Sequence, residues 1–303
     1  MRGTRHPLRW LAALPVLATA ASAQLPPSDQ VEVSVNYVYA AQFGLGSYEV
    51  GGLQVDVYTL PIPYTWRDVY RDWDLHLRVP IVYGSYDFAA TIEERGQLVH
   101  VSADTNSLAV APRLRLDIPL PLDGLRLSPI APWGVGATFD SSGRARAATI
   151  EVPLSTSESW FYTWEAGVSS LYQRHQRDLT GNLGMALLGA GDNTFEGDSV
   201  EAYGSFRAGV EGRHPLGFTI EGREPDGGLY VIYDHFFPSL QFSRVRRASL
   251  EVSNLVEVGA TLGAASPLEL PWVGDMLDDL QLGAAYQVGD GLDAWKLSTG
   301  FPF

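Results

Sequence analysis

Apolar and polar residues alternate in one segment after another, and this period of two limits the possible folds more than any other feature of the chain. In "WFYTWEAGVSS", Trp160, Tyr162 and Trp164 alternate with Thr163 and Glu165. Successive side chains of a strand point to opposite faces, so such a segment has one apolar and one polar face. The same pattern recurs from residue 31 to residue 303, and it predicts an all-β protein.

The polar face is charged in strand after strand, whereas the apolar face carries almost no charge. This division suits a barrel with a wet interior and a lipid-facing exterior, because an Arg or Lys facing lipid at mid-membrane costs about 2–4 kcal/mol. A soluble β-sandwich with its apolar faces turned inward shows the same alternation and stays open as an alternative. The residues expected to line the lumen are Asp56, Asp74, His76, Arg78, Arg113, Arg115, Glu165, Arg207 and Glu257.

The first 23 residues have the form of a secretory signal peptide. Three arginines precede an apolar stretch, which closes on Ala21-Ser22-Ala23, so cleavage is expected before Gln24. The apolar stretch is shorter than the roughly 20 residues of a membrane-spanning helix. We therefore expect residues 1–23 to be removed and residues 24–303 to form the barrel. Loss of the three arginines would take the net charge from −14 to −17, which argues against nucleic-acid binding.

Turn residues divide the chain into twelve expected strands, an even number as in bacterial outer-membrane barrels. The expected strands cover 30–41, 51–61, 72–84, 107–119, 124–138, 158–172, 182–190, 199–212, 216–236 (interrupted), 248–263, 279–289 and 292–303. Ten or fourteen strands remain alternatives. Short connections such as "PLPLDG" and "GRHPLG" suit periplasmic turns, and the longer polar stretches 85–106, 139–157, 191–198 and 237–247 are expected to be outer loops. Aromatic residues near strand ends suit the girdles of a membrane barrel, and they are Tyr37, Tyr39, Trp73, Tyr83, Trp160, Tyr162, Tyr286 and Trp295.

The last hairpin, "LQLGAAYQVGDGLDAWKLSTGFPF", resembles the end of an autotransporter-type barrel, and in particular the solitary outer-membrane autotransporter-like β-barrel family. The resemblance lies in the small residues before Tyr286, the tight turn at Gly289-Asp290-Gly291 and the final "GFPF". It implies a location in the outer membrane of a Gram-negative cell, in contact with lipid and lipopolysaccharide. By analogy with other outer-membrane proteins, the terminal alternation of Trp295, Leu297, Phe301 and Phe303 is expected to be the signal read by the barrel-assembly machinery. The first expected strand follows the cleavage site closely, so no passenger is expected, unlike in an ordinary autotransporter.

No catalytic or cofactor site is expected. His235 follows Asp234, and adjacent strand residues point to opposite faces, so this Asp is badly placed to orient this His. The chain has no cysteine and no zinc or phosphate-loop spacing. Asp192, Glu196 and Asp198 loosely resemble a calcium loop but lack the closing Glu, and an acidic outer loop is the simpler interpretation. Arg244, Arg246 and Arg247 are candidates for holding lipopolysaccharide phosphates.

Three functions remain open at this point. The first is a narrow, cation-preferring pore lined by the inward carboxylates, since twelve strands lie between the filled eight-stranded and open sixteen-stranded barrels. The second is a closed structural or surface-interaction barrel that acts through its outer loops. The third, an enzyme acting on outer-leaflet lipid, would need a nucleophile–histidine pair that the sequence lacks. The sequence makes no prediction of oligomeric state.

Overall fold

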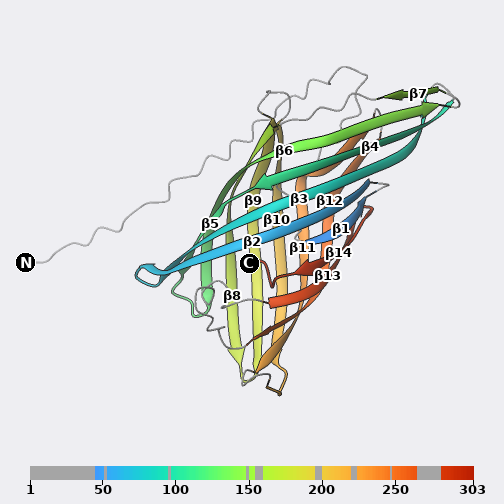
Figure 1. The fold of residues 1–303 in the computed structure, drawn as a ribbon. Coiled ribbons are helices and arrows are strands. Elements are labelled where there is room, and N and C mark those ends of the chain that lie inside the picture. The colour runs from blue at the N-terminus through green and yellow to red at the C-terminus, as the bar shows by residue number, and fades with distance from the viewer. Residues whose placement is uncertain are drawn as a thin grey trace, which may run out of the picture. The chain divides into compact units, whose positions relative to one another are not determined.

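The computed structural model describes residues 45–50, 53–94, 97–147, 150–153, 160–194, 200–219, 224–245, 248–264 and 281–303, which are almost entirely β-strand (Figure 1). No helix among these residues has the length and hydropathy needed to cross a membrane. The strands are β1 (Leu45–Val50), β2 (Leu53–Tyr70), β3 (Trp73–Glu94), β4 (Gln97–Val110), β5 (Arg113–Pro119), β6 (Leu125–Ala147), β7 (Ile150–Pro153), β8 (Trp160–Gln176), β9 (Leu179–Thr194), β10 (Val200–Pro215), β11 (Pro225–Val245), β12 (Ala248–Ala264), β13 (Gln281–Gly289) and β14 (Leu292–Ser298).

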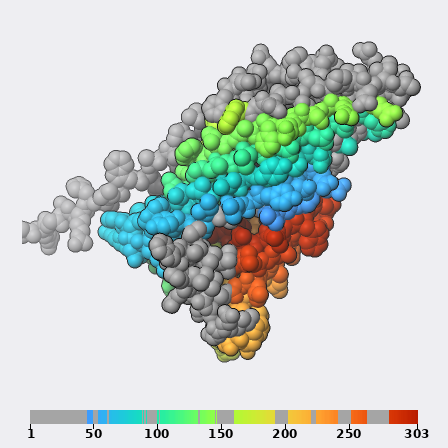
Figure 2. Space-filling view, in the orientation of Figure 1, coloured from blue at the N-terminus to red at the C-terminus, as the bar shows by residue number. Residues whose placement is uncertain are grey.

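These strands form one closed antiparallel barrel. Most pair with their neighbours in the chain, and β1 pairs with both β2 and β14, which closes the ring. Figure 2 shows this closure as the N-terminal strands in blue lying against the C-terminal strands in red. β4 and β5 keep the same register against β6 and form a single barrel strand interrupted at Pro112, while β7 pairs only with β6. The described residues therefore build twelve barrel strands, and the predicted all-β barrel is confirmed.

The strand boundaries differ from expectation mainly at the two ends of the chain. The expected strand 30–41 lies outside the described residues, and β1 at Leu45–Val50 was not predicted. The expected interrupted strand 216–236 is wrong in its first part, because β10 ends at Pro215 and β11 begins at Pro225. The last expected strand, 292–303, stops at Ser298, after which the chain turns at Gly300 with φ +118°.

The stretches expected to be long outer loops are largely paired strand. β3 and β4 stay hydrogen-bonded to the tip of their hairpin, where Glu94 pairs with Gln97. In the same way β6 runs to Ala147, β9 to Thr194 and β11 to Val245. Their polar residues suggested loops, but backbone hydrogen bonds between strands do not depend on the polarity of the side chains.

One face of the barrel wall is apolar and solvent-exposed. Across β2 and β3, Leu60 pairs with Ile81 and Ile62 with Val79, and all of these lie on this outer face. A belt of such residues needs a hydrocarbon environment, because few soluble proteins expose a continuous apolar surface of this size. Other exposed members of the belt are Tyr64, Trp66, Leu108, Val135, Trp164, Val168, Leu183, Met185, Leu187, Val210, Leu229, Val231, Val258, Leu262, Leu282, Trp295 and Leu297.

A polar collar borders the belt at the end where the long hairpins lie. Tyrosine hydroxyls on the outer face donate there to residues of the next strand, from Tyr83 to Asn106 at 2.8 Å and from Tyr233 to Asn254 at 2.7 Å. Such residues, with an apolar ring and a polar tip, suit a membrane–water interface. Asp56 belongs to this collar, because it pairs with Ser85 on the outer face.

The expectation that Asp56 lines the lumen is therefore wrong. Val55 and Val57 take the inner face instead, where they are buried together with Tyr48 and Tyr86. A charge on the outer face is tolerated here because Asp56 lies at the collar rather than in the belt.

The tight turn at Gly289-Asp290-Gly291 lies at the same end of the barrel and ties β13 to β12. The Asp290 carboxylate accepts hydrogen bonds from the backbone N–H groups of Ser253 at 2.8 Å and Asn254 at 2.7 Å. These donors favour the ionised form and lower the pKa of Asp290. Asp290, Gly291 and Gly289 all have positive φ, which explains the two glycines.

The effect of membrane depth on the cost of a charge in the belt can be tested on β9. Leu187 and Leu179 lie on the outer face of β9 with equal exposure, 52% and 51%, but Leu179 adjoins the short turn at 177–178 and Leu187 lies mid-strand. In lipid vesicles, L187R should lower the free energy of unfolding by about 2–4 kcal/mol, and L179R by about 0–1 kcal/mol. Urea unfolding of both variants measures this, and equal losses would contradict the membrane placement of the belt.

Candidate functional site: the barrel interior

The inner face of the wall is identified by contacts between strands that are not neighbours. One buried cluster joins Ile130 of β6, Leu188 of β9, Ile232 of β11 and Ala285 of β13 to the C-terminal Phe303. Only the inside of a closed barrel brings such distant strands together. Register from these residues places eight of the nine expected lumen residues on the inner face, namely Asp74, His76, Arg78, Arg113, Arg115, Glu165, Arg207 and Glu257.

One group of inner charges lies between β3 and β8. Arg113 of β5 reaches across β6 and binds both carboxylate oxygens of Glu165 on β8, at 2.7 and 2.8 Å. Next to it, Asp117 accepts hydrogen bonds from Arg115 at 2.6 Å and Ser128 at 2.8 Å. Arg115 binds both oxygens of Asp117 through Nε and Nη2, which the planar guanidinium fork suits. These contacts tie β5, β6 and β8 together on the inner face.

A second group lies between β10 and β14. Arg207 binds Asp234 of the neighbouring strand at 2.6 Å. Glu257 is nearly fully buried and is held by the Lys296 ammonium at 2.7 Å, the Gln287 amide at 2.7 Å and the Tyr230 hydroxyl at 2.8 Å. A buried carboxylate needs such a set of donors, because an unpaired charge in a low-dielectric interior is costly.

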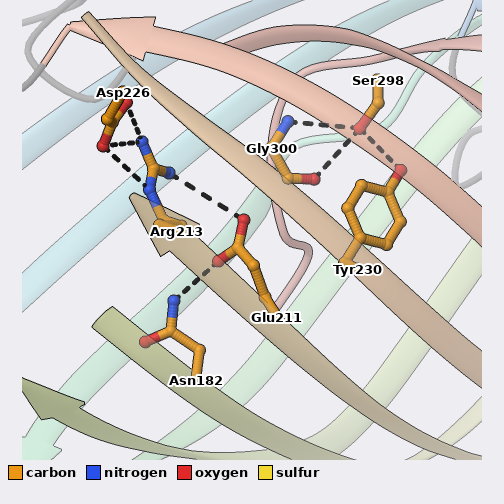
Figure 3. Close-up of polar contacts among 7 residues, drawn as sticks. All are labelled: Asn182, Glu211, Arg213, Asp226, Tyr230, Ser298 and Gly300. Atoms are coloured by element: carbon orange, nitrogen blue, oxygen red, sulfur yellow. Dashed lines mark hydrogen bonds and ion pairs between the residues drawn. The ribbon is translucent and has the colours of Figure 1, made fainter. Parts of the chain in front are cut away.

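A third group, drawn in Figure 3, lies beside the point where the chain leaves β14. Arg213 binds Asp226 across the β10–β11 pair at 2.5 Å, and Asn182 of β9 donates to Glu211 at 2.6 Å. Glu211 lies 3.9 Å from Arg213, so its carboxylate also has a cation nearby. In all three groups the inner carboxylates face cations, and the charges of the interior largely cancel.

The C-terminal tail (residues 299–303) leaves the wall and enters this interior. Tyr230 lies 2.9 Å from Ser298, the last residue of β14, and Gly300 then turns the chain inward (Figure 3). Phe303 is only 5% exposed in the cluster defined above, and Phe301 packs on it with ring centroids 4.7 Å apart. Arg78 of β3 approaches Thr299 at 3.5 Å. The tail thus touches strands around the barrel and fills part of the lumen.

This position departs from the expected C-terminal signal. Trp295 and Leu297 lie on the outer face with exposures of 67% and 57%, as the alternation predicts. Phe301 and Phe303 continue the same alternation in sequence but lie inside. The reason is local, because the turn at Gly300 breaks the strand and the interior offers glycine-lined space for an aromatic ring.

Several inner residues were not among those expected, namely Asp117, Glu211, Arg213, Asp226, Tyr230, Asp234, Gln287 and Lys296. Most lie on the same face of a strand as an expected lumen residue, so the alternation of polar and apolar residues alone could have identified them. Lys296 and Glu211, for example, continue the polar faces of β14 and β10.

The candidates for chemistry are not brought together. Asp234 points inward to Arg207, whereas His235 lies on the outer face, 3.0 Å from Asn254. Within the described ranges no group of three or more His, Cys, Asp or Glu side chains is placed to hold a metal ion. The side chains of Asp192 and Arg244, and all of Glu196, Asp198, Arg246 and Arg247, lie outside what the structure describes.

Comparison with solved structures identifies the architecture. The β domain of the Bordetella autotransporter BrkA superposes with a TM-score of 0.52 over 84% of this chain and 96% of that chain, at 10% sequence identity. The fold is that of an autotransporter β-domain. The transport unit of AIDA-I from Escherichia coli has a TM-score of 0.48 (12% identity, 84% and 87% of the two chains), and the translocator domain of NalP from Neisseria meningitidis 0.47 (13%, 85% and 84%). No protein-family model and no curated protein matches the chain.

The autotransporter-type barrel expected from the last hairpin is therefore confirmed at the level of the fold. At these identities the likeness carries the architecture and not an activity. What the interior of this autotransporter β-domain fold can do rests on its own residues.

The pairing of the inner charges has a measurable consequence. K296M should lower the free energy of unfolding by about 3–5 kcal/mol, because it leaves the buried Glu257 carboxylate without its cation. Adding E257Q to K296M should recover much of this loss, since the uncharged amide that replaces the carboxylate keeps partners in Tyr230 and Gln287. Urea unfolding of both single variants and the double variant forms the cycle, and additive losses would show that the two groups are not coupled.

Proposed function

We propose that this chain is an outer-membrane β-barrel whose lumen is held shut at rest by its own C-terminal tail. The observation that carries the proposal is the burial of Phe303 among residues of β6, β9, β11 and β13. The apolar outer belt, the polar collar and the likeness to the BrkA β domain support the membrane location. In this proposal residues 1–23 are a cleaved signal peptide and residues 24–303 form the barrel.

The ion-paired interior favours a closed barrel over the cation-preferring pore. Such a pore needs free carboxylates along its axis, but Glu165 is bound by Arg113 and Glu257 by Lys296. Ion pairs that join strands also stiffen the wall. An inserted helix, about 10–12 Å across with its side chains, would have to displace the tail.

The same proposal assigns roles to the two chain regions that meet the membrane and its assembly factors. Trp295 and Leu297, which face lipid, suit recognition by the barrel-assembly machinery, together with Phe301 and Phe303 before the tail folds inward. Arg244, Arg246 and Arg247 are the residues proposed for contact with lipopolysaccharide phosphates. No enzymatic role is proposed.

Removing the two tail rings tests the closed state. The F301A/F303A variant should conduct several-fold more than the parent chain in a planar bilayer, because it empties the centre of the lumen cluster. P302A is the matched control, since Pro302 is exposed and outside that cluster, and it should stay as quiet as the parent. A folded F301A/F303A barrel, recognised by heat-modifiable gel mobility, with no added conductance would overturn the proposal.

Ion selectivity distinguishes a barrel closed by its tail from a cation-preferring pore. The opened F301A/F303A barrel should show a reversal potential close to zero in a potassium chloride gradient, because the inner carboxylates are neutralised by neighbouring cations. A strongly cation-selective current that weakens in E165Q would instead favour the cation-preferring pore.

A further inference from the structure

Glycines in the barrel wall are repeatedly covered by an aromatic ring from the neighbouring strand. Gly136 pairs directly with Phe161, Gly204 with Phe237 and Gly259 with Tyr230. A Cβ atom placed on any of these glycines would overlap the ring of its partner. Each glycine therefore leaves a depression that an aromatic side chain of the wall itself fills.

One glycine pair is filled differently. Gly184 of β9 and Gly209 of β10 pair directly with each other on the inner face. On either side of them in the same row, Leu171 of β8 pairs with Gly184 and Ile232 of β11 pairs with Gly209. We call this row of four residues the glycine pocket. The wall supplies no aromatic ring to it from these paired positions. The ring that fills it is Phe303, which a Cβ on Gly184 would overlap and a Cβ on Gly209 would approach to 2.8 Å.

The occupant of the glycine pocket is held by side-chain contacts and not by strand pairing. Residues 299–303 belong to no strand, and the backbone bond from Phe303 N–H to the Phe301 carbonyl, 3.0 Å long, is internal to the tail. Gly300 provides a backbone conformation that favours a turn rather than a strand. A ring delivered by a five-residue tail can leave and be replaced, whereas Phe161, Phe237 and Tyr230 are fixed by strand pairing.

We infer that the glycine pocket is a binding site for an aromatic side chain of an extended peptide, and that the C-terminal tail is its tethered ligand. The chemistry of the site sets the ligand class. Two glycines give a flat floor, Leu171 and Ile232 give apolar walls, and Ala186, Leu188 and Ala285 complete an apolar surround. The ring of Phe301, beside that of Phe303, indicates a preference for two aromatic residues one position apart.

This inference rests on the proposed function, because it gives the closed lumen a ligand that could be exchanged for another polypeptide segment. A segment that carries aromatic residues and enters the barrel would compete with the tail for one pocket. The lumen would then respond to the sequence of that segment and not only to its width.

The test supplies the tail in trans. A chain ending at Ser298 vacates the pocket, and the F301A/F303A chain provides a second empty-pocket variant in case truncation prevents assembly. Each refolded barrel is titrated with a fluorescently labelled Ser-Thr-Gly-Phe-Pro-Phe peptide, followed by anisotropy, with Ser-Thr-Gly-Ala-Pro-Ala as the control peptide. The phenylalanine peptide should bind saturably, and the alanine peptide at least about tenfold more weakly.

A glycine substitution maps the site. G184A in the empty-pocket chain should weaken binding by about tenfold or more, because its methyl group takes the space of the ring. G212A is the matched control on the adjacent strand, since a Cβ there meets nothing within 4 Å, and it should bind like the parent.

The outcomes separate this inference from the closed-barrel proposal. Binding that G184A abolishes and G212A preserves supports the site. A folded empty-pocket barrel that conducts but does not discriminate between the two peptides overturns the site and leaves the closed barrel standing. Binding without any gain of conductance in the empty-pocket barrel supports the site and removes the role of the tail as a plug.

Discussion

Closure of the backbone hydrogen bonds between β1 and β14 is the constraint on which the rest of the structure depends. A wall in hydrocarbon cannot leave a row of N–H and C=O groups unpaired, because lipid tails offer no partners. The pairing of Leu45 with Leu297 through Val50 with Leu292 meets this requirement where the two ends of the chain come together. Closure also separates an outer face from an inner face, and every side chain of the strands then has one of two environments.

The inner charges follow from that separation. Twelve strands enclose too little water to solvate many isolated charges, so carboxylates such as Glu257 and Glu165 are held by Lys296 and Arg113. The tail completes the packing with aromatic rings at a point where the wall has only glycine. The polar cross-links and the apolar tail both fill part of the narrow interior, where buried polar groups need hydrogen-bond partners.

The sequence predicted those parts of the molecule in which a local pattern has only one explanation. The faces of β8 are an example, because Trp160 and Trp164 point to lipid while Thr163 and Glu165 point inward. The partner of Glu165 was not predictable, since Arg113 is 52 residues away and reaches it only through the stagger of the strands. Asp56 was assigned to the wrong face because alternation does not say which face of a strand near the collar is wet.

The tail and the long hairpins escaped prediction for different reasons. Phe301 and Phe303 continue an alternation that suits lipid and an apolar lumen pocket equally, so only the turn at Gly300 distinguishes the two. The β3–β4 hairpin beyond the collar is paired strand although it is rich in polar residues, because its pairing is made by backbone groups that side-chain polarity does not report. Local periodicity reports contrasts between environments, and it is silent wherever the contrast disappears.

The charges inside the barrel nearly cancel, so the electrostatic field of the protein comes mainly from charges outside the interior. The chain carries a net charge of −14, yet its inner carboxylates are matched by arginines and a lysine. Among the described residues, unbalanced acids lie outside the interior, where Glu49, Asp56 and Asp87 are exposed or half-buried. Dissolved salt screens charges in water over about 10 Å but hardly reaches buried pairs, so ionic strength will change how the two ends of the barrel meet their surroundings and leave its axis almost untouched.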